Sequence, residues 1–286
     1  YFFVANSKFK ILFYSKKTLS EKDYNHLVKK RDEILGWPIR NDNFNISGFI
    51  PRSKSKFENY CVSLYGDSFT FSAEVNEDLS WSELSSKKLK CNVSNYGSGG
   101  YGLYQSYLKY KINSKFDNSE IIVLNHTTEN IARIRNQYRE LIYQNQKKGF
   151  KPTAYLDENG NLIHVPIVSF KNYQDYKFNV ENIKKNKFKY EYYLPEYNFS
   201  NFNFNYSYIY NFVYALFKHH RIKKFINKEP WFSHHYLNND DINLTYKIID
   251  EFINLAKFNQ KVPVITIIPT CKDLKYFKSK GKFVYQ

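Results

Sequence analysis

The sequence contains no methionine, few cysteines and no long apolar segment. A translated chain begins with Met, so a 286-residue chain that begins at Tyr1 and holds no Met is expected to be a piece of a longer or processed protein. A signal peptide or an anchor preceding Tyr1 would then be invisible here. No run of about 18 apolar residues occurs, and we therefore expect no membrane-spanning helix and see no sign of membrane association within these residues.

Cysteine is limited to Cys61, Cys91 and Cys271. None of these has the C-x-x-C spacing that is typical of a zinc site, so no metal is predicted. Cys61 and Cys91 lie in short apolar runs, and we expect both to be buried as small hydrophobic residues. The number of cysteines does not define the redox compartment.

Acidic residues are scarce relative to basic ones: the chain has 27 Asp and Glu residues and 43 Lys and Arg residues, which gives a net charge of +16. Such an excess is typical of proteins that bind nucleic acid, acidic glycans or lipid headgroups. The lysines, however, are spread along the chain, and the abundance of Lys, Asn, Ile, Phe and Tyr matches the codon bias of an AT-rich genome. We attribute the charge mainly to this bias and predict no specific nucleic-acid partner.

Short apolar runs alternate with helical segments in the middle of the chain, which indicates βαβ units and a parallel sheet. A capping box, Ser80 to Glu83, marks the start of one of the helices. In chain order we expect a strand at 60–65, a helix to about Lys90, a strand at 91–96, a helix at 102–113, a strand at 121–125 and a helix at 130–146.

The expected organisation is an N-terminal lead-in, residues 1–58, followed by one α/β domain, residues 59–286. The lead-in holds one helix at 21–35 and is otherwise irregular. Residues 150–206 interrupt the alternation and are interpreted as an insertion, with a hairpin at Asn159-Gly160. Further helices at 207–226 and 240–258 and a buried strand at 261–270 complete a three-layer α/β/α fold with about five mostly parallel strands.

Three polar motifs follow successive predicted strands. Gly66-Asp67-Ser68 follows the first strand, a glycine-rich run from Asn95 to Gly102 follows the second, and Asn130 follows the third. Each is also typical of a structural role, namely a capped turn, a flexible loop and a helix N-cap. Because the carboxyl ends of parallel strands meet at one edge of a sheet, we expect the motifs to converge. A serine, free backbone N–H groups and an amide then suit attack on a carbonyl and binding of the resulting oxyanion.

The order of these motifs resembles the SGNH (GDSL-type) serine hydrolase family. The resemblance rests on GDSFTF, NYGSGGYGLYQ and TTEN and covers roughly residues 35–270. It implies a flavodoxin-like fold, Ser68 as nucleophile and first oxyanion N–H, Gly100 as second N–H, and Asn130 as side-chain donor. Gln105 matches a recurrent polar position without an assigned role.

The function implied by the resemblance is ester hydrolysis or O-acyl transfer through a Ser68 acyl-enzyme. The implied substrate is an acylated carbohydrate or a lipid ester, and no metal or organic cofactor is required. The bacterial relatives that the motifs resemble modify surface polysaccharides, which favours the cell envelope or periplasm over the cytoplasm.

The chain departs from the family pattern in two places. The third block carries Glu129 where Gly is common and Ile131 where Asp is common. The last block, D-x-x-H, is absent, and its histidine is the base that takes the serine proton. We therefore expect no histidine within hydrogen-bond reach of Ser68 and expect the base beyond Gln286. His126 is the first candidate for a replacement, whereas the pairs His219-His220 and His234-His235 make poor metal sites.

The missing base leaves a second hypothesis open. The chain could be a catalytically degenerate SGNH domain that binds glycan through the aromatic, basic stretch at 184–214. The intact Ser, Gly and Asn motifs argue for the enzyme.

Overall fold

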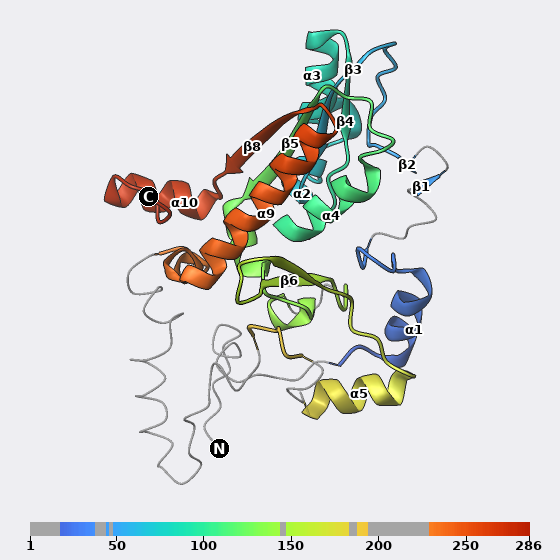
Figure 1. The fold of residues 1–286 in the computed structure, drawn as a ribbon, viewed down its shortest axis with the longest axis vertical. Coiled ribbons are helices and arrows are strands. Elements are labelled where there is room, and N and C mark those ends of the chain that lie inside the picture. Colours follow the sequence, from blue (N-terminus) through green and yellow to red (C-terminus); the bar gives the residue numbers. More distant parts are fainter. Residues whose placement is uncertain (1–17, 38–43, 46–47, 144–146, 183–187, 194–228) are drawn as a thin grey trace.

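The computed structural model describes residues 18–37, 44–45, 48–143, 147–182, 188–193 and 229–286 (Figure 1). Its centre is a four-stranded, entirely parallel sheet in the order β4-β3-β5-β8. The strands are β3 (Tyr60–Tyr65), β4 (Asn92–Asn95), β5 (Ile121–Thr127) and β8 (Val262–Ile268). The α/β class is confirmed, and within the described ranges the sheet has four strands instead of about five.

The strand order places a topological switch point between β3 and β5. The chain leaves β3 towards β4 on one side, whereas it leaves β5 towards β8 on the other. Connections that diverge in this way open a crevice at the carboxyl ends of the two strands, which is where open α/β sheets bind ligands. The segments that follow β3 and β5 are therefore the first place to search for a site.

Helices flank the sheet. Helix α4 (Leu103–Asn113) packs on β3 and β5, and α9 (Asn239–Phe258) packs on β8 and on α4. Their apolar side chains share one core with Tyr65 and Leu124 of the sheet. Leu64 and Val123 alternate to the opposite face of the sheet, as the period of two in a strand requires. Helix α3 (Trp81–Leu89) packs against β4 and is N-capped by Ser80, as the capping box predicts.

The predicted helix at 130–146 is wrong over residues 130–143, and its last three residues fall outside the described ranges. The structure instead has two 3-10 segments, η2 (Thr128–Arg133) and η3 (Arg139–Leu141). The buried carboxylate of Glu191 accepts hydrogen bonds from the backbone N–H groups of Gln137 (2.5 Å) and Tyr138 (2.9 Å). A helix would give those donors to its own carbonyl groups, so an acid distant in sequence interrupts it.

Several peripheral elements complete the described chain. The hairpin at Asn159-Gly160 is confirmed, whereas the first helix ends earlier than expected. The sequence did not predict the antiparallel pair at 44–49, the short helical segments at 68–71, 77–79 and 233–237, or the helices at 173–182 and 271–280. The full set of peripheral elements is α1 (Glu21–Lys30), β1 (Phe44–Asn45), β2 (Gly48–Phe49), α2 (Ser68–Phe71), η1 (Glu77–Leu79), β6 (Thr153–Leu156), β7 (Leu162–Val165), α5 (Tyr173–Asn182), η4 (Ser233–Leu237) and α10 (Cys271–Lys280).

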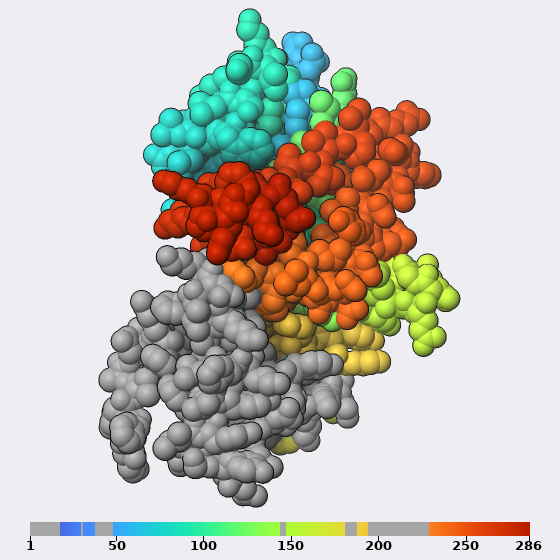
Figure 2. Space-filling model, turned by 90° about the vertical axis from the view of Figure 1, so that its left-hand side faces the viewer, coloured from blue at the N-terminus to red at the C-terminus, as the bar shows by residue number. Residues whose placement is uncertain are grey.

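Helix α10 lies on the outside of the molecule (Figure 2), with Asp273 buried and Leu274 exposed. No helix in the described ranges is long and apolar enough to cross a bilayer. The predicted helix at 207–226, most of the aromatic stretch 184–214, and His219-His220 fall outside the described residues.

The expectation for two of the cysteines is also wrong. Cys61 and Cys91 are only half-buried, and they form a disulfide with a Cα–Cα distance of 5.9 Å. The bond joins the second residue of β3 to the residue that precedes β4, and these two strands pair side by side. Pairing of the strands brings the two thiols together, which their separation in sequence does not indicate. Cys271 is free and exposed.

Candidate active site

Ser68 stands where β3 turns into α2. Asp67 caps the turn, since its Oδ1 accepts a hydrogen bond of 2.9 Å from the backbone N–H of Phe69. Ser68 is half-buried, and among the described residues no hydrogen bond involves its hydroxyl group. The hydroxyl is therefore partly accessible and is not held by a neighbouring side chain of the described part of the chain.

A polar chain joins the three segments that the sequence motifs predict to converge. Asn130 Nδ2 donates to Asp67 Oδ2 (3.0 Å), and Arg133 Nη1 lies 3.7 Å from the same oxygen. Arg133 Nη1 also donates to the carbonyl oxygen of Tyr101 (2.7 Å). Asp67 adjoins Ser68, and Tyr101 adjoins Gly100. The turn after β3, the loop after β4 and the segment after β5 thus meet at the switch point.

The orientation of the Asn130 amide follows from this contact. An ionised carboxylate only accepts hydrogen bonds, so the amide must turn its NH2 group towards Asp67. One N–H of that group is used by Asp67. Asn130 is buried, and neither its second N–H nor its Oδ1 has a hydrogen-bond partner within the described chain.

The glycine loop, residues 97–102, lies directly against the Ser68 turn. The N–H of Ser98 donates to the carbonyl oxygen of Gly66 (3.0 Å). A Cβ atom at Gly97 would fall inside contact distance of the Phe71 backbone nitrogen, so only glycine allows this approach. Gly100 has φ +85°, in the left-handed region, and is half-exposed.

A buried lysine on α4 hydrogen-bonds the glycine loop. Lys109 Nζ donates to the carbonyl oxygen of Tyr96 (2.8 Å) and to Ser98 Oγ (3.0 Å), and it lies 4.9 Å from the centre of the Phe49 ring. Burial lowers the pKa of Lys109 to about 7. Helix α4 is buried on nearly all sides, and its sequence gives no indication of this inward-facing lysine.

A second lysine, which the sequence did not single out, approaches the loop from outside. Lys148 Nζ donates to the carbonyl oxygen of Gly99 (2.5 Å), which also accepts from Trp37 Nε1 (2.9 Å). The ammonium group lies 5.2 Å from the centre of the Trp37 ring. Burial, together with the charges of Arg139 and Arg133, lowers the pKa of Lys148 to about 8.

The departures from the family pattern have local structural roles. Glu129 forms an ion pair with Arg133, and Ile131 is fully buried in a small apolar cluster. Gln105 accepts a hydrogen bond from the N–H of Gly102 (3.2 Å) and donates to the carbonyl oxygen of Leu35 (2.8 Å). Gln105 therefore caps α4 and anchors the end of the glycine loop.

His126 makes no hydrogen bond to Ser68 and is bonded elsewhere. Tyr236 donates its only hydroxyl proton to the carbonyl oxygen of Thr128 (2.8 Å), so at 3.3 Å the Nε2 of His126 must be the donor to Tyr236. Burial lowers the pKa of His126 to about 4. His164 bonds the Tyr104 hydroxyl instead (2.8 Å), and no histidine of the described ranges hydrogen-bonds the Ser68 hydroxyl.

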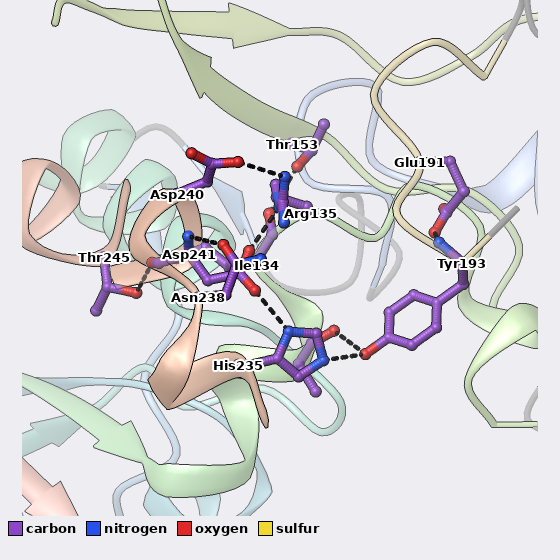
Figure 3. A network of polar contacts seen from close by, with 11 residues as sticks. Ile134, Arg135, Thr153, Glu191, Tyr193, His235, Asn238, Asp240, Asp241 and Thr245 are labelled. Atoms are coloured by element: carbon purple, nitrogen blue, oxygen red, sulfur yellow. Dashed lines mark hydrogen bonds and ion pairs between the residues drawn. The ribbon is translucent and has the colours of Figure 1, made fainter. Parts of the chain in front are cut away.

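His235 has a structural role next to the site (Figure 3). Its Nδ1 lies 2.7 Å from Asp241 Oδ2, and its Nε2 lies 2.7 Å from the hydroxyl of Tyr193, which donates to the carbonyl oxygen of Ala132 (2.9 Å). Arg135 Nε donates to the other oxygen of Asp241 (2.5 Å). These contacts fasten the segment after Asn130 to the start of α9. Within the described ranges, no cluster of three His, Cys, Asp or Glu residues could hold a metal.

Comparison of the chain with models of known protein families, with curated proteins and with solved structures finds no match in any of the three.

Proposed function

We propose that the protein is a serine hydrolase of the SGNH type that acts on ester bonds through a Ser68 acyl-enzyme. The substrate class is an acylated carbohydrate or a lipid ester, and the acyl group passes to water or to a second hydroxyl group. The observation that supports this function is the polar chain from Asp67 through Asn130 and Arg133 to Tyr101. It gathers a partly exposed serine, a glycine loop and an amide donor at the switch point of the sheet.

In the proposed reaction, Ser68 Oγ attacks the ester carbonyl carbon and its proton passes to a general base. The carbonyl oxygen takes the electron pair of the broken π bond and becomes an oxyanion. The backbone N–H groups of Ser68 and Gly100 and the second N–H of Asn130 are the proposed donors to it. Collapse of the intermediate breaks the ester C–O bond, and the leaving alkoxide takes the proton from the same base and departs as the alcohol. Water or an acceptor hydroxyl then gives its proton to that base and attacks the acyl carbon, and the bond to Ser68 Oγ breaks as Oγ takes the proton back.

The test is turnover of a short-chain aryl ester by the protein and by Ser68→Ala. Loss of the attacking oxygen is expected to lower kcat by about three or more orders of magnitude. Ser85→Ala is the matched control, because Ser85 is a half-buried serine on α3 without a hydrogen bond to another described residue. Equal activity in the Ser68 and Ser85 variants would remove Ser68 from the mechanism.

A second candidate is a glycan-binding module without turnover. It is favoured by the absence of a hydrogen bond between Ser68 and any histidine of the described ranges. A binding module would retain acetylated oligosaccharide without release of acetate, and Ser68→Ala would bind it equally well. Stoichiometric labelling of Ser68 by a fluorophosphonate, detected by mass spectrometry, would instead support the enzyme.

A further inference from the structure

We propose that the substrate carries a carboxylate group that binds Lys148 beside Gly100, an inference that rests on the proposed function of Ser68 and Gly100. The site would then select anionic esters, such as esters of acidic sugars or of dicarboxylic acids, over neutral ones.

The position of Lys148 carries this proposal. Its Nζ lies 3.1 Å from the point at which a side chain on Gly100 would begin, so the ammonium group sits directly over the proposed oxyanion glycine. Lys148, Gly99 and Gly100 are all half-exposed, as is Ser68, so a substrate can reach the group. An ammonium has three N–H donors, and the only hydrogen bond of Lys148 Nζ within the described chain is the one to Gly99. The other donors can therefore be given to a ligand.

The surrounding charges favour an anion at this point. The charges of Arg139 and Arg133 both lower the pKa of Lys148, whereas the charge of Glu140 raises it. The Glu140 carboxylate accepts hydrogen bonds from the backbone N–H groups of Lys148 (2.7 Å) and Gly149 (3.1 Å), and these stabilise its negative charge. Burial is the main cause of the lowered pKa of Lys148, but the effect of each arginine is larger than that of Glu140. The charges around Lys148 therefore add a positive potential, which stabilises a carboxylate next to it.

The purely structural alternative is that Lys148 only fastens the glycine loop. Fastening requires the hydrogen bond to Gly99 and the contact with Trp37, and neither depends on the charge of the substrate. A role in recognition predicts discrimination between substrates, which a loop anchor does not. Loss of a recognition role would change the ratio of kcat/KM for anionic esters to kcat/KM for neutral esters. Loss of a loop anchor would lower both values alike.

The experiment compares mono-4-nitrophenyl succinate with 4-nitrophenyl butyrate, which share the leaving group and the four-carbon acyl chain. In Lys148→Met the ratio of kcat/KM for succinate to butyrate is expected to fall roughly 10- to 100-fold, the worth of one charge-assisted hydrogen bond. Lys147→Met is the control, since Lys147 is exposed and pairs with Asp23 away from the loop. Lys148→Arg should keep the preference up to pH 9, whereas in the wild type it should decline above pH 8 as Lys148 loses its proton.

An unchanged ratio in Lys148→Met overturns the inference and leaves the hydrolase intact. If the wild type turns over neither ester, the hydrolase proposal fails, and calorimetric titration with succinate itself then decides the anion site. Succinate binding that is lost in Lys148→Met and kept in Lys147→Met supports the site. Equal binding to all three proteins, or binding to none, overturns it.

Discussion

At the scale of single residues, the site depends on buried polar groups that each satisfy more than one neighbour. Asp67 is 1% exposed and accepts hydrogen bonds from the Phe69 backbone and from Asn130, with Arg133 close by. A buried carboxylate without such partners would be strongly destabilising. Asp67 therefore links the Ser68 turn to the segment after β5, and its carboxylate orients the Asn130 amide.

The role of Asn130 can be tested with two substitutions. Asn130→Ala removes one proposed oxyanion donor, and kcat for the aryl ester is expected to fall about 100- to 1000-fold. Asn130→Asp places a second carboxylate against Asp67, whose oxygen lies 3.0 Å from the present amide nitrogen, and should lower stability as well as activity. Circular dichroism and thermal unfolding separate the two effects. An Asn130→Ala variant that does not fold would show that the amide is a structural cap.

At the scale of elements, the regular α/β core was predictable because its signals are local. The capping box at Ser80, the turn at Asn159-Gly160 and the apolar runs of β3, β5 and β8 each act over a few residues. The prediction that β8 is buried was wrong, since all of its residues are exposed or half-buried at the edge of the sheet. The errors come from long-range contacts. Glu191 interrupts the predicted helix at Tyr138 from 53 residues away, and Lys148 reaches Gly99 across 49 residues.

The candidate site likewise contains residues that a local sequence pattern identifies and residues that only tertiary contacts reveal. Ser68, the glycine loop and Asn130 could be located because their positions after the strands are a local pattern, and Gly100 was chosen within the loop by the family resemblance. The structure brings the three segments together. Neither Lys148 nor Lys109 has a local signal, since both act through tertiary contacts. Arg133, three residues after Asn130, could have been found as a residue on the same side of that turn.

The disulfide joins two neighbouring strands, and its removal should destabilise the domain. The bond spans 30 residues, and closing a loop of that length reduces the entropy of the unfolded chain by about 3 to 4 kcal/mol. Cys61→Ser with Cys91→Ser is expected to lower the free energy of unfolding by that amount in urea titrations. Cys271→Ser is the control, because Cys271 is exposed and free. If dithiothreitol leaves the urea midpoint of the wild type unchanged, the bond does not form in solution.

At the scale of the whole molecule, the charge excess has a consequence for stability. Most lysines of the described ranges are exposed, but burial lowers the pKa of Lys109 and Lys151 to about 7 and that of Lys148 to about 8. In the unfolded chain these groups titrate near 10.5. Between pH 7 and pH 10 the unfolded state therefore binds more protons than the folded state, and the free energy of unfolding rises with pH in this range.

The same linkage sets both limits of the stable range. Below about pH 6.5 the unfolded chain protonates His126, which burial keeps neutral down to about pH 4, so stability falls further in acid. Above pH 10 the unfolded chain loses protons from tyrosines such as Tyr96 and Tyr176, whose pKa burial raises to about 12, and stability falls again. The maximum of stability should consequently lie near pH 9 to 10, more alkaline than the range of about pH 5 to 8 that is usual for globular proteins.

Chemical unfolding at fixed ionic strength between pH 5 and pH 11 measures this profile. Lys109→Met is expected to remove up to one proton equivalent from the slope between pH 7 and pH 10, because its ammonium no longer enters the balance. Lys147→Met should leave the slope unchanged, since Lys147 is exposed. A wild-type maximum near pH 7, or equal slopes in the two variants, would show that Lys109 keeps its proton in the folded state. In that case the two oxygen acceptors and the Phe49 ring that surround the ammonium group outweigh its burial.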